Sequence, residues 1–229
     1  MTGRLIAAID TPELPHARDL VREVAPHCGL VKLGLEFFLR HGPGGYRDAA
    51  HGADVFLDLK LHDIPNTVAG AVRSILPLAP RLMTVHAGGG AKMVAAAAEA
   101  AATAGEARPK ILAVTVLTSF DAAGLAETGV SGGTSQQVLR LARLALGAGA
   151  DGLVCSAHEI AVLRDAFGER PLLVVPGIRP AGAALGDQAR VMTAEQAVEA
   201  GADYIVVGRP ITGAANPGVA AAAIAASIA

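Results

Sequence analysis

The chain has 229 residues, of which 52% are hydrophobic and only 3% are aromatic, with a formal net charge of -2. This net charge produces no long-range field that would attract nucleic acid or an anionic membrane. No apolar run approaches the length of a membrane span. The length suits one large domain or two small ones, and without a visible linker we expect residues 1–229 to form a single domain. Cys28 and Cys155 lack metal-ligand spacing, and with no signal peptide they are expected to be reduced thiols in a cytoplasmic protein.

Eight apolar runs alternate with helical patterns along the chain. Runs rich in Val, Ile and Leu are typical of parallel strands that are buried on both faces. The expected strands cover residues 4–10, 29–34, 53–59, 81–86, 110–117, 152–156, 172–175 and 204–207. Parallel strands need crossover helices, and eight such units close into a (β/α)8 TIM barrel of the α/β class. An open doubly wound sheet is the alternative, but the first turn lacks its G-x-G-x-x-G pattern.

A charged stretch, residues 58–68, begins at the carboxyl end of the third expected strand. By strand alternation Asp58 and Lys60 point the same way, whereas the leucines that flank Asp58 face the other side. Charged residues are rarely buried without partners, so these groups are expected to pair with one another at a functional site rather than on a solvated surface. Asp63 lies beyond the strand, where it can turn back over the strand end or reach a neighbouring subunit. Asn66 is expected to cap the following helix.

Polar residues also follow other strands, at the end of the barrel where TIM-barrel active sites lie. Alternation predicts that Asp10, Lys32, Asp58 and Lys60 face inward at a similar height and form one array of alternating charge. An ammonium group held between carboxylates stays protonated, so Lys60 is expected to act as a cation and proton donor rather than as a base. The other polar residues at these ends are Asp63, Thr118, Ser119, Arg179, Gln188 and Arg209.

Gly208 and Arg209 follow the last strand. Loops after the seventh and eighth strands of such barrels commonly bind phosphate through backbone N–H groups, and an arginine adds a bidentate grip. Pairing of Arg209 with a surface carboxylate is the alternative. The segment 177–190 has the length and small residues of a mobile lid, although an ordinary exposed loop would look the same. His86 is expected to be structural, because no second metal ligand is spaced with it.

Over its whole length the chain resembles the orotidine 5′-phosphate decarboxylase family. The most specific part is the run 58–67, D-L-K-L-H-D-I-P-N-T, which is similar to the family signature. Further similar segments occur in the same order: Asp10, Val31-Lys32-Leu33-Gly34, Leu117-Thr118-Ser119, Pro176-Gly177-Ile178-Arg179 and Val207-Gly208-Arg209. The resemblance implies decarboxylation of orotidine 5′-monophosphate to uridine 5′-monophosphate in pyrimidine biosynthesis, without cofactor or metal. It also implies a homodimer in which Asp63, Ile64 and Thr67 enter the partner's active site.

The resemblance further implies a role for each matching residue. Lys60 would stabilise the ring carbanion and then protonate it, and Asp58 would lie near the departing carboxylate. The other implied contacts to the substrate are Asp10, Lys32 and Asp63 at the ribose, Thr118 or Ser119 at the pyrimidine, and Gln188, Gly208 and Arg209 at the phosphate, with Ile64, Thr67 and Arg179 completing the set.

Two other functions fit parts of the pattern. Magnesium-dependent sugar-phosphate decarboxylases and aldolases of the same superfamily share the Asp-x-Lys-x-x-Asp spacing, but they place a carboxylate on the second strand. Here that position is Lys32, which would repel magnesium, and Glu36 is expected to lie already in the next helix. A non-catalytic barrel that binds phosphate ligands is the second alternative, although binding alone does not require so costly a buried array. A nucleic-acid-binding role lacks a basic patch and stacking aromatic residues.

Overall fold

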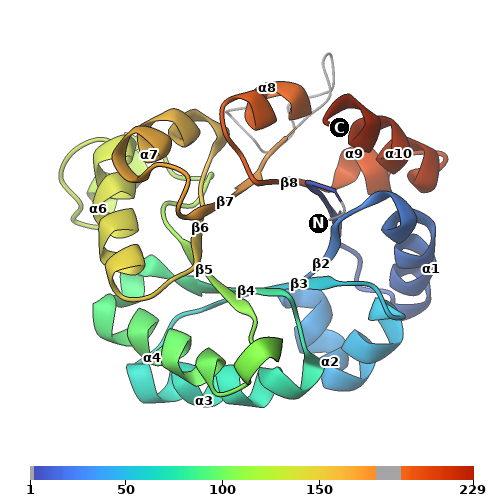
Figure 1. Cartoon of the computed structure of the whole chain (residues 1–229), viewed down its shortest axis with the longest axis horizontal. Helices are drawn as coiled ribbons and strands as arrows, with labels where there is room; N and C mark the ends of the chain where they lie inside the picture. The colour runs from blue at the N-terminus through green and yellow to red at the C-terminus, as the bar shows by residue number, and fades with distance from the viewer. Residues whose placement is uncertain (1–2, 179–191) are drawn as a thin grey trace.

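Eight parallel strands close into a barrel in the computed structural model, which describes residues 3–178 and 192–229 (Figure 1). Each strand pairs with the next one in sequence, and the last pairs with the first. The strands are β1 Leu5–Ile9, β2 Leu30–Gly34, β3 Val55–Leu61, β4 Leu82–His86, β5 Lys110–Val114, β6 Gly152–Val154, β7 Leu172–Pro176 and β8 Tyr204–Val207. The (β/α)8 barrel is therefore confirmed, and the open doubly wound sheet is excluded.

Helices surround the barrel and connect its strands (Figure 1). Their bounds are α1 Leu14–Val24, α2 Leu35–Ala50, α3 Pro65–Ile75, α4 Ala91–Ala102, α5 Ala122–Glu127, α6 Thr134–Gly147, α7 Ile160–Phe167, α8 Ala194–Glu199, α9 Arg209–Thr212 and α10 Pro217–Ser227. Parallel neighbours cannot be joined by a tight hairpin, so each connection must cross the outside of the sheet. This places the carboxyl ends of all eight strands at one mouth of the barrel.

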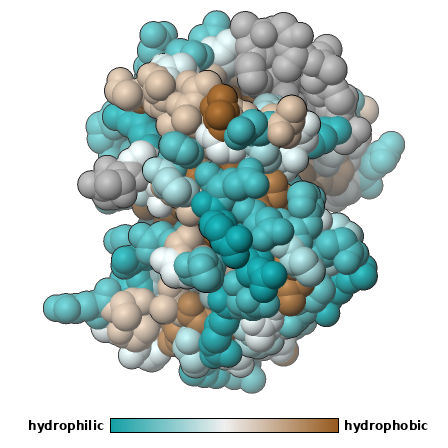
Figure 2. Space-filling view, turned by 90° about the vertical axis from the view of Figure 1, so that its right-hand side faces the viewer, coloured by the Kyte–Doolittle hydropathy of each residue, from teal (hydrophilic) through white to brown (hydrophobic). Residues whose placement is uncertain are grey.

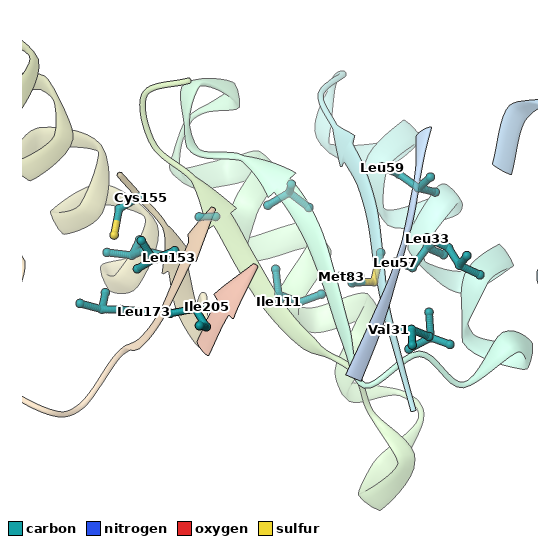
Figure 3. Packing of buried hydrophobic residues seen from close by; sticks show 14 of the residues in the cluster. Val31, Leu33, Leu57, Leu59, Met83, Ile111, Leu153, Cys155, Leu173 and Ile205 are labelled. Carbon is teal, nitrogen blue, oxygen red and sulfur yellow. The ribbon is translucent and has the colours of Figure 1, made fainter. Parts of the chain in front are cut away.

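Strand alternation divides the core into two layers. Side chains that point outward pack against the helices, and Figure 3 shows several of them, including Leu33, Leu57, Leu153 and Leu173. Side chains that point inward fill the barrel with a separate apolar cluster: Ile6, Ala8, Leu30, Phe56, Leu82, Leu112, Val174 and Val206. Because the interior is filled in this way, inward polar residues find room mainly at the ends of the strands.

Some local expectations were wrong, each for a physical reason. Asn66 does not cap α3, because the helix begins at Pro65 and Ile64 occupies the N-cap position. Proline suits the first helical position, where its missing N–H has no partner to lose. β5 ends at Val114 rather than at residue 117, since both the backbone N–H and the hydroxyl of Thr115 bind the carbonyl of Val154 and end the regular ladder.

The surface and the remaining connections fit a globular barrel. The side shown in Figure 2 mixes hydrophilic and weakly hydrophobic residues, with strongly hydrophobic side chains in small separate spots. α5 is a short helix between β5 and α6, and α2 is kinked at Gly42, where φ is 59°. Thr193 caps α8 through a reciprocal pair of hydrogen bonds with Gln196. Across the described part of the chain, no helix has the length and apolar character needed to span a bilayer.

Candidate active site

Four charged side chains meet at the carboxyl ends of β1, β2 and β3. The Nζ atom of Lys32 lies 3.0 Å from Oδ1 of Asp10 and 3.8 Å from Oδ2 of Asp58. The same Asp58 oxygen lies 2.8 Å from Nζ of Lys60. The structure thus brings together the four residues for which alternation predicted a common array. The side chain of Lys60 is 36% exposed and that of Asp58 only 11%, so Lys60 is the more accessible partner of this pair.

The carboxyl group of Asp58 is held in its ionised form. Burial raises its pKa, but the charges of Lys32 and Lys60, with hydrogen bonds from Lys60 and Thr84, outweigh this effect and leave the pKa below its ordinary value. An anion is therefore fixed beside the ammonium group of Lys60 at neutral pH. An ammonium group at this position can stabilise negative charge and donate a proton.

A cavity of about 160 Å³ opens beside these charges. Lys32, Asp58 and Lys60 form its charged side. The rest of its lining is mostly apolar: Phe56, Val114, Val116, Leu117, Thr118, Val154, Cys155, Pro176 and Val206. An apolar wall lowers the local dielectric constant and strengthens the field of the lysines. The arrangement can hold a ring against a cation, with apolar side chains on its other sides.

A larger depression of about 800 Å³ lies at the opposite end of the barrel. Several of its charged residues form ion pairs with one another, since Arg81 pairs with Asp54 at 2.8 Å and Arg108 pairs through both its terminal nitrogens with Asp151. Surface ion pairs of this kind contribute little to stability. The active sites of TIM barrels lie at the carboxyl face, which is the other end of the barrel. We therefore place the candidate active site at the smaller cavity.

Other predicted residues occupy distinct positions around this mouth. Thr118 lines the cavity, whereas Ser119 is exposed and lies outside the lining. Gly208 lies beside the array, because a Cβ atom added there would be 3.6 Å from Oδ2 of Asp10. Arg209, at the start of α9, is exposed. Arg179, Gln188 and the rest of the expected lid from residue 179 onward lie outside the described residues.

Asp63, Ile64 and Thr67 take no part in the array within a single chain. All three are exposed, and one carboxylate oxygen of Asp63 accepts a hydrogen bond of 2.6 Å from the backbone N–H of Ile64. The side chain of Ile64 is a large apolar group with 66% of its surface exposed. These residues are therefore presented outward, at the loop that follows β3.

Two histidines lie next to the charged residues. The rings of His62 and His86 are 5.4 Å apart, and burial, followed by the charges of His62 and Lys60, lowers the pKa of His86 against the opposing effect of Asp58. The ring of His86 thus packs against that of His62 in surroundings that disfavour its charged form. Within residues 3–178 and 192–229, no group of three or more His, Cys, Asp or Glu side chains is arranged to hold a metal ion.

Sequence reasoning missed Thr84. Its side chain is fully buried on β4, yet its hydroxyl group contacts both Asp58 and the backbone of Lys60. A threonine inside an apolar strand is ordinarily a core residue, so its type gave no signal. The only available clue was its parity with His86, which places it on the inner face of the barrel.

Comparison with known proteins agrees with this geometry. Residues 3–224 match the model of the Orotidine 5′-phosphate decarboxylase / HUMPS family. The chain belongs to this family. It is 57% identical over 226 residues to an orotidine 5′-phosphate decarboxylase of Anaeromyxobacter sp. (strain K), with 98% of each chain covered. It is 56% identical over 224 residues to that of Gluconobacter oxydans (strain 621H), covering 96% of this chain and 95% of the relative.

The fold agrees with a solved structure of the family as well. The crystal structure of orotidine 5′-phosphate decarboxylase from Lactobacillus acidophilus superposes with a TM-score of 0.88 at 37% sequence identity, and 99% of each chain is covered. The similarity therefore extends over essentially the whole chain.

Proposed function

We propose that this chain decarboxylates orotidine 5′-monophosphate to uridine 5′-monophosphate, without a cofactor, as a step of pyrimidine biosynthesis. The observation that carries the proposal is the ammonium group of Lys60, held 2.8 Å from the buried carboxylate of Asp58 at the wall of an apolar cavity. Family membership and the near full-length similarity to decarboxylases support it.

The chemistry needs a cation at this place. Loss of carbon dioxide leaves an electron pair on the ring carbon, in an orbital of the ring plane that the ring carbonyl groups cannot delocalise. Stabilisation must then come from a charge that is already in position, because reorganising solvent would cost free energy at the moment of reaction. Lys60 provides this charge and transfers a proton to the same carbon. Asp58 keeps the ammonium group in place and lies near the departing carboxylate.

Further residues bind the parts of the substrate that do not react. Asp10 and Lys32, with Asp63 of a partner, hold the ribose, and Thr118 is favoured over Ser119 at the pyrimidine because it lines the cavity. The phosphate-binding residues are Gln188, Gly208 and Arg209, and Arg179 belongs to the same substrate-binding set. Binding energy from the phosphate is remote from the reacting carbon and serves to fix the ring beside Lys60.

The proposal includes a homodimer in the cytoplasm, with residues 1–229 of each chain forming one domain. Asp63, Ile64 and Thr67 would complete the partner's site. Their exposure supports this, as do two further large apolar side chains near the same mouth, Leu35 at 50% and Leu39 at 75% exposure. Contiguous exposed apolar residues are typical of protein interfaces.

Magnesium-dependent sugar-phosphate chemistry is the second candidate, because the matching family description also includes the HUMPS group. The position of Lys32 disfavours it, since its ammonium group already lies between the carboxylates of Asp10 and Asp58. A divalent cation there would have to displace it or be repelled by it.

The test follows the ultraviolet absorbance of orotidine 5′-monophosphate with purified protein, with and without excess chelator. Rapid loss of absorbance at the same rate in both samples supports the proposal. No loss, together with magnesium-dependent turnover of a sugar phosphate, would assign the chain to the second candidate. No turnover of either substrate would leave only a phosphate-ligand binding barrel.

A further inference from the structure

The pairing of β3 with β4 is irregular at the active site. Leu57 pairs with Met83 and Leu61 pairs with Val85, so the three residues from Asp58 to Lys60 lie opposite Thr84. Lys60 lies in the left-handed region with φ 50°, which is unfavourable for a residue with a side chain. Bulges of this kind commonly redirect side chains next to active sites.

The hydroxyl group of Thr84 occupies this irregularity. The backbone N–H of Lys60 lies 2.8 Å from Oγ1 of Thr84, and the same oxygen lies 2.9 Å from Oδ1 of Asp58. The direction of both hydrogen bonds is fixed by chemistry. A backbone N–H can only donate and an ionised carboxylate can only accept, so the single hydroxyl proton must go to Asp58.

These two bonds connect the backbone of one site residue to the carboxylate of another. Oδ1 of Asp58 is held by Thr84, while Oδ2 faces Lys60 at 2.8 Å and Lys32 at 3.8 Å. The carboxylate plane is therefore fixed from both sides. Without the hydroxyl group, the N–H of Lys60 would lose the acceptor that it has in the bulge, and Asp58 would be free to rotate about its last torsion angle.

We propose that Thr84 is a positioning residue that sets the geometry of Asp58 relative to Lys60 through these two hydrogen bonds. The inference rests on the proposed function for its effect on turnover. Thr84 is 0% exposed and cannot touch a substrate, so it acts through the two charged residues. Its loss should lower kcat much more than it changes KM or the affinity for uridine 5′-monophosphate.

Thr115 provides a matched control. It is also a buried threonine at the end of the neighbouring strand, with 5% exposure, and its hydroxyl donates to the carbonyl of Val154 at 3.1 Å. Thr115→Val therefore removes one buried hydroxyl group and one hydrogen bond without touching the charged array. A loss of activity that comes only from placing valine at a buried threonine would appear in both variants. The loss of kcat that we propose would appear only in Thr84→Val.

The experiment compares wild type, Thr84→Val, Thr84→Ser and Thr115→Val in kcat, KM and binding of uridine 5′-monophosphate. Misplacement of a reacting group by about 1 Å costs on the order of 100-fold. We expect Thr84→Val to lose about 10- to 100-fold in kcat, with KM and product affinity within about threefold, whereas Thr84→Ser and Thr115→Val stay within about threefold of wild type in all three quantities. If Thr84→Val does not fold, Thr84→Cys replaces it, because its thiol is only a weak donor and acceptor.

A Thr84→Val kcat within threefold of wild type, or a loss equal to that of Thr115→Val, would overturn the inference. A second readout does not depend on turnover. Carbon-13 NMR of labelled aspartate follows the titration of Asp58, whose titratable neighbours Lys32, Lys60 and His86 are the same in every variant. The pKa of Asp58 should rise in Thr84→Val and not in Thr115→Val. An unchanged pKa refutes the inference, whereas wild-type protein without turnover refutes the proposed function alone.

Discussion

Replacing Lys32 by methionine tests how the buried charge array is stabilised. The substitution keeps an unbranched side chain, one atom shorter, but removes a cation that is 8% exposed and lies 3.8 Å from Asp58. At that distance the attraction is about 4 kcal/mol for an effective dielectric constant of about 20. The pair with Asp10 adds little, because that carboxylate is 61% exposed and well solvated.

The net effect is smaller than the sum of attractions, because burying the ammonium group of Lys32 has its own cost. Removing one partner of a buried pair typically destabilises by about 3–5 kcal/mol, and Asp58 keeps its contacts with Lys60 and Thr84. We therefore expect the free energy of unfolding at pH 7 to fall by about 3 kcal/mol in Lys32→Met. Urea denaturation followed by circular dichroism measures it.

The loss of unfolding free energy in Lys32→Met should depend on pH in a definite direction. In the wild type the folded pKa of Asp58 is lowered, so its contribution to stability is present above the unfolded pKa and is lost as pH falls through the folded pKa. Removing Lys32 takes away the largest of the effects that lower this pKa, so the folded pKa rises. The difference between wild type and variant should therefore be full at pH 7 and shrink in acid.

Lys110→Met is the control, because Lys110 is 50% exposed and lies 3.5 Å from Asp151 at the other end of the barrel. Its loss should cost no more than about 1 kcal/mol. A Lys32→Met effect no larger than that of the control, or a difference that stays constant from neutral to acid pH, would refute the reasoning about the array.

Three further predictions concern binding and assembly. Arg209→Ala should weaken uridine 5′-monophosphate by about 10- to 100-fold while leaving uridine affinity unchanged, as calorimetry would measure; equal losses for both ligands would remove Arg209 from the phosphate. Ile64→Asp should convert a dimer to a monomer in analytical ultracentrifugation, whereas Val219→Asp, at a similar exposure of 64%, should leave the mass unchanged; a persistent Ile64→Asp dimer would exclude this loop from the interface. Thr118→Val should raise KM for orotidine 5′-monophosphate more than Ser119→Ala does, and the reverse order would contradict the assignment from the cavity lining.

Much of the fold could be predicted because it depends on local pattern. Apolar runs gave the strands, and strand parity alone placed Lys32 and Asp58 on the inner face, where the structure brings them together with Asp10 and Lys60. Closure of eight such units then puts all strand ends at one mouth.

What could not be predicted depends on contacts between distant segments. The bulge at Lys60 exists where β3 meets Thr84, 24 residues away in sequence, and nothing in either strand alone indicates it. The prediction that Asn66 caps α3 was wrong because proline is favoured at the first position of a helix. The helix therefore begins at Pro65, and Asn66 lies inside it. The roles of Arg179 and Gln188 stay predictions.

The central claim is that Lys60 supplies both the stabilising charge and the proton. Its most direct test is the turnover of orotidine 5′-monophosphate by Lys60→Ala, with Lys92→Ala, at an exposed lysine of α4, as the control. Both variants should fold and bind uridine 5′-monophosphate. Lys60→Ala should lose about 100- to 1,000-fold or more in kcat, because loss of one preorganised group of this kind costs about that much, and Lys92→Ala should match the wild type. Decarboxylation by Lys60→Ala within about tenfold of the wild-type rate would contradict the account.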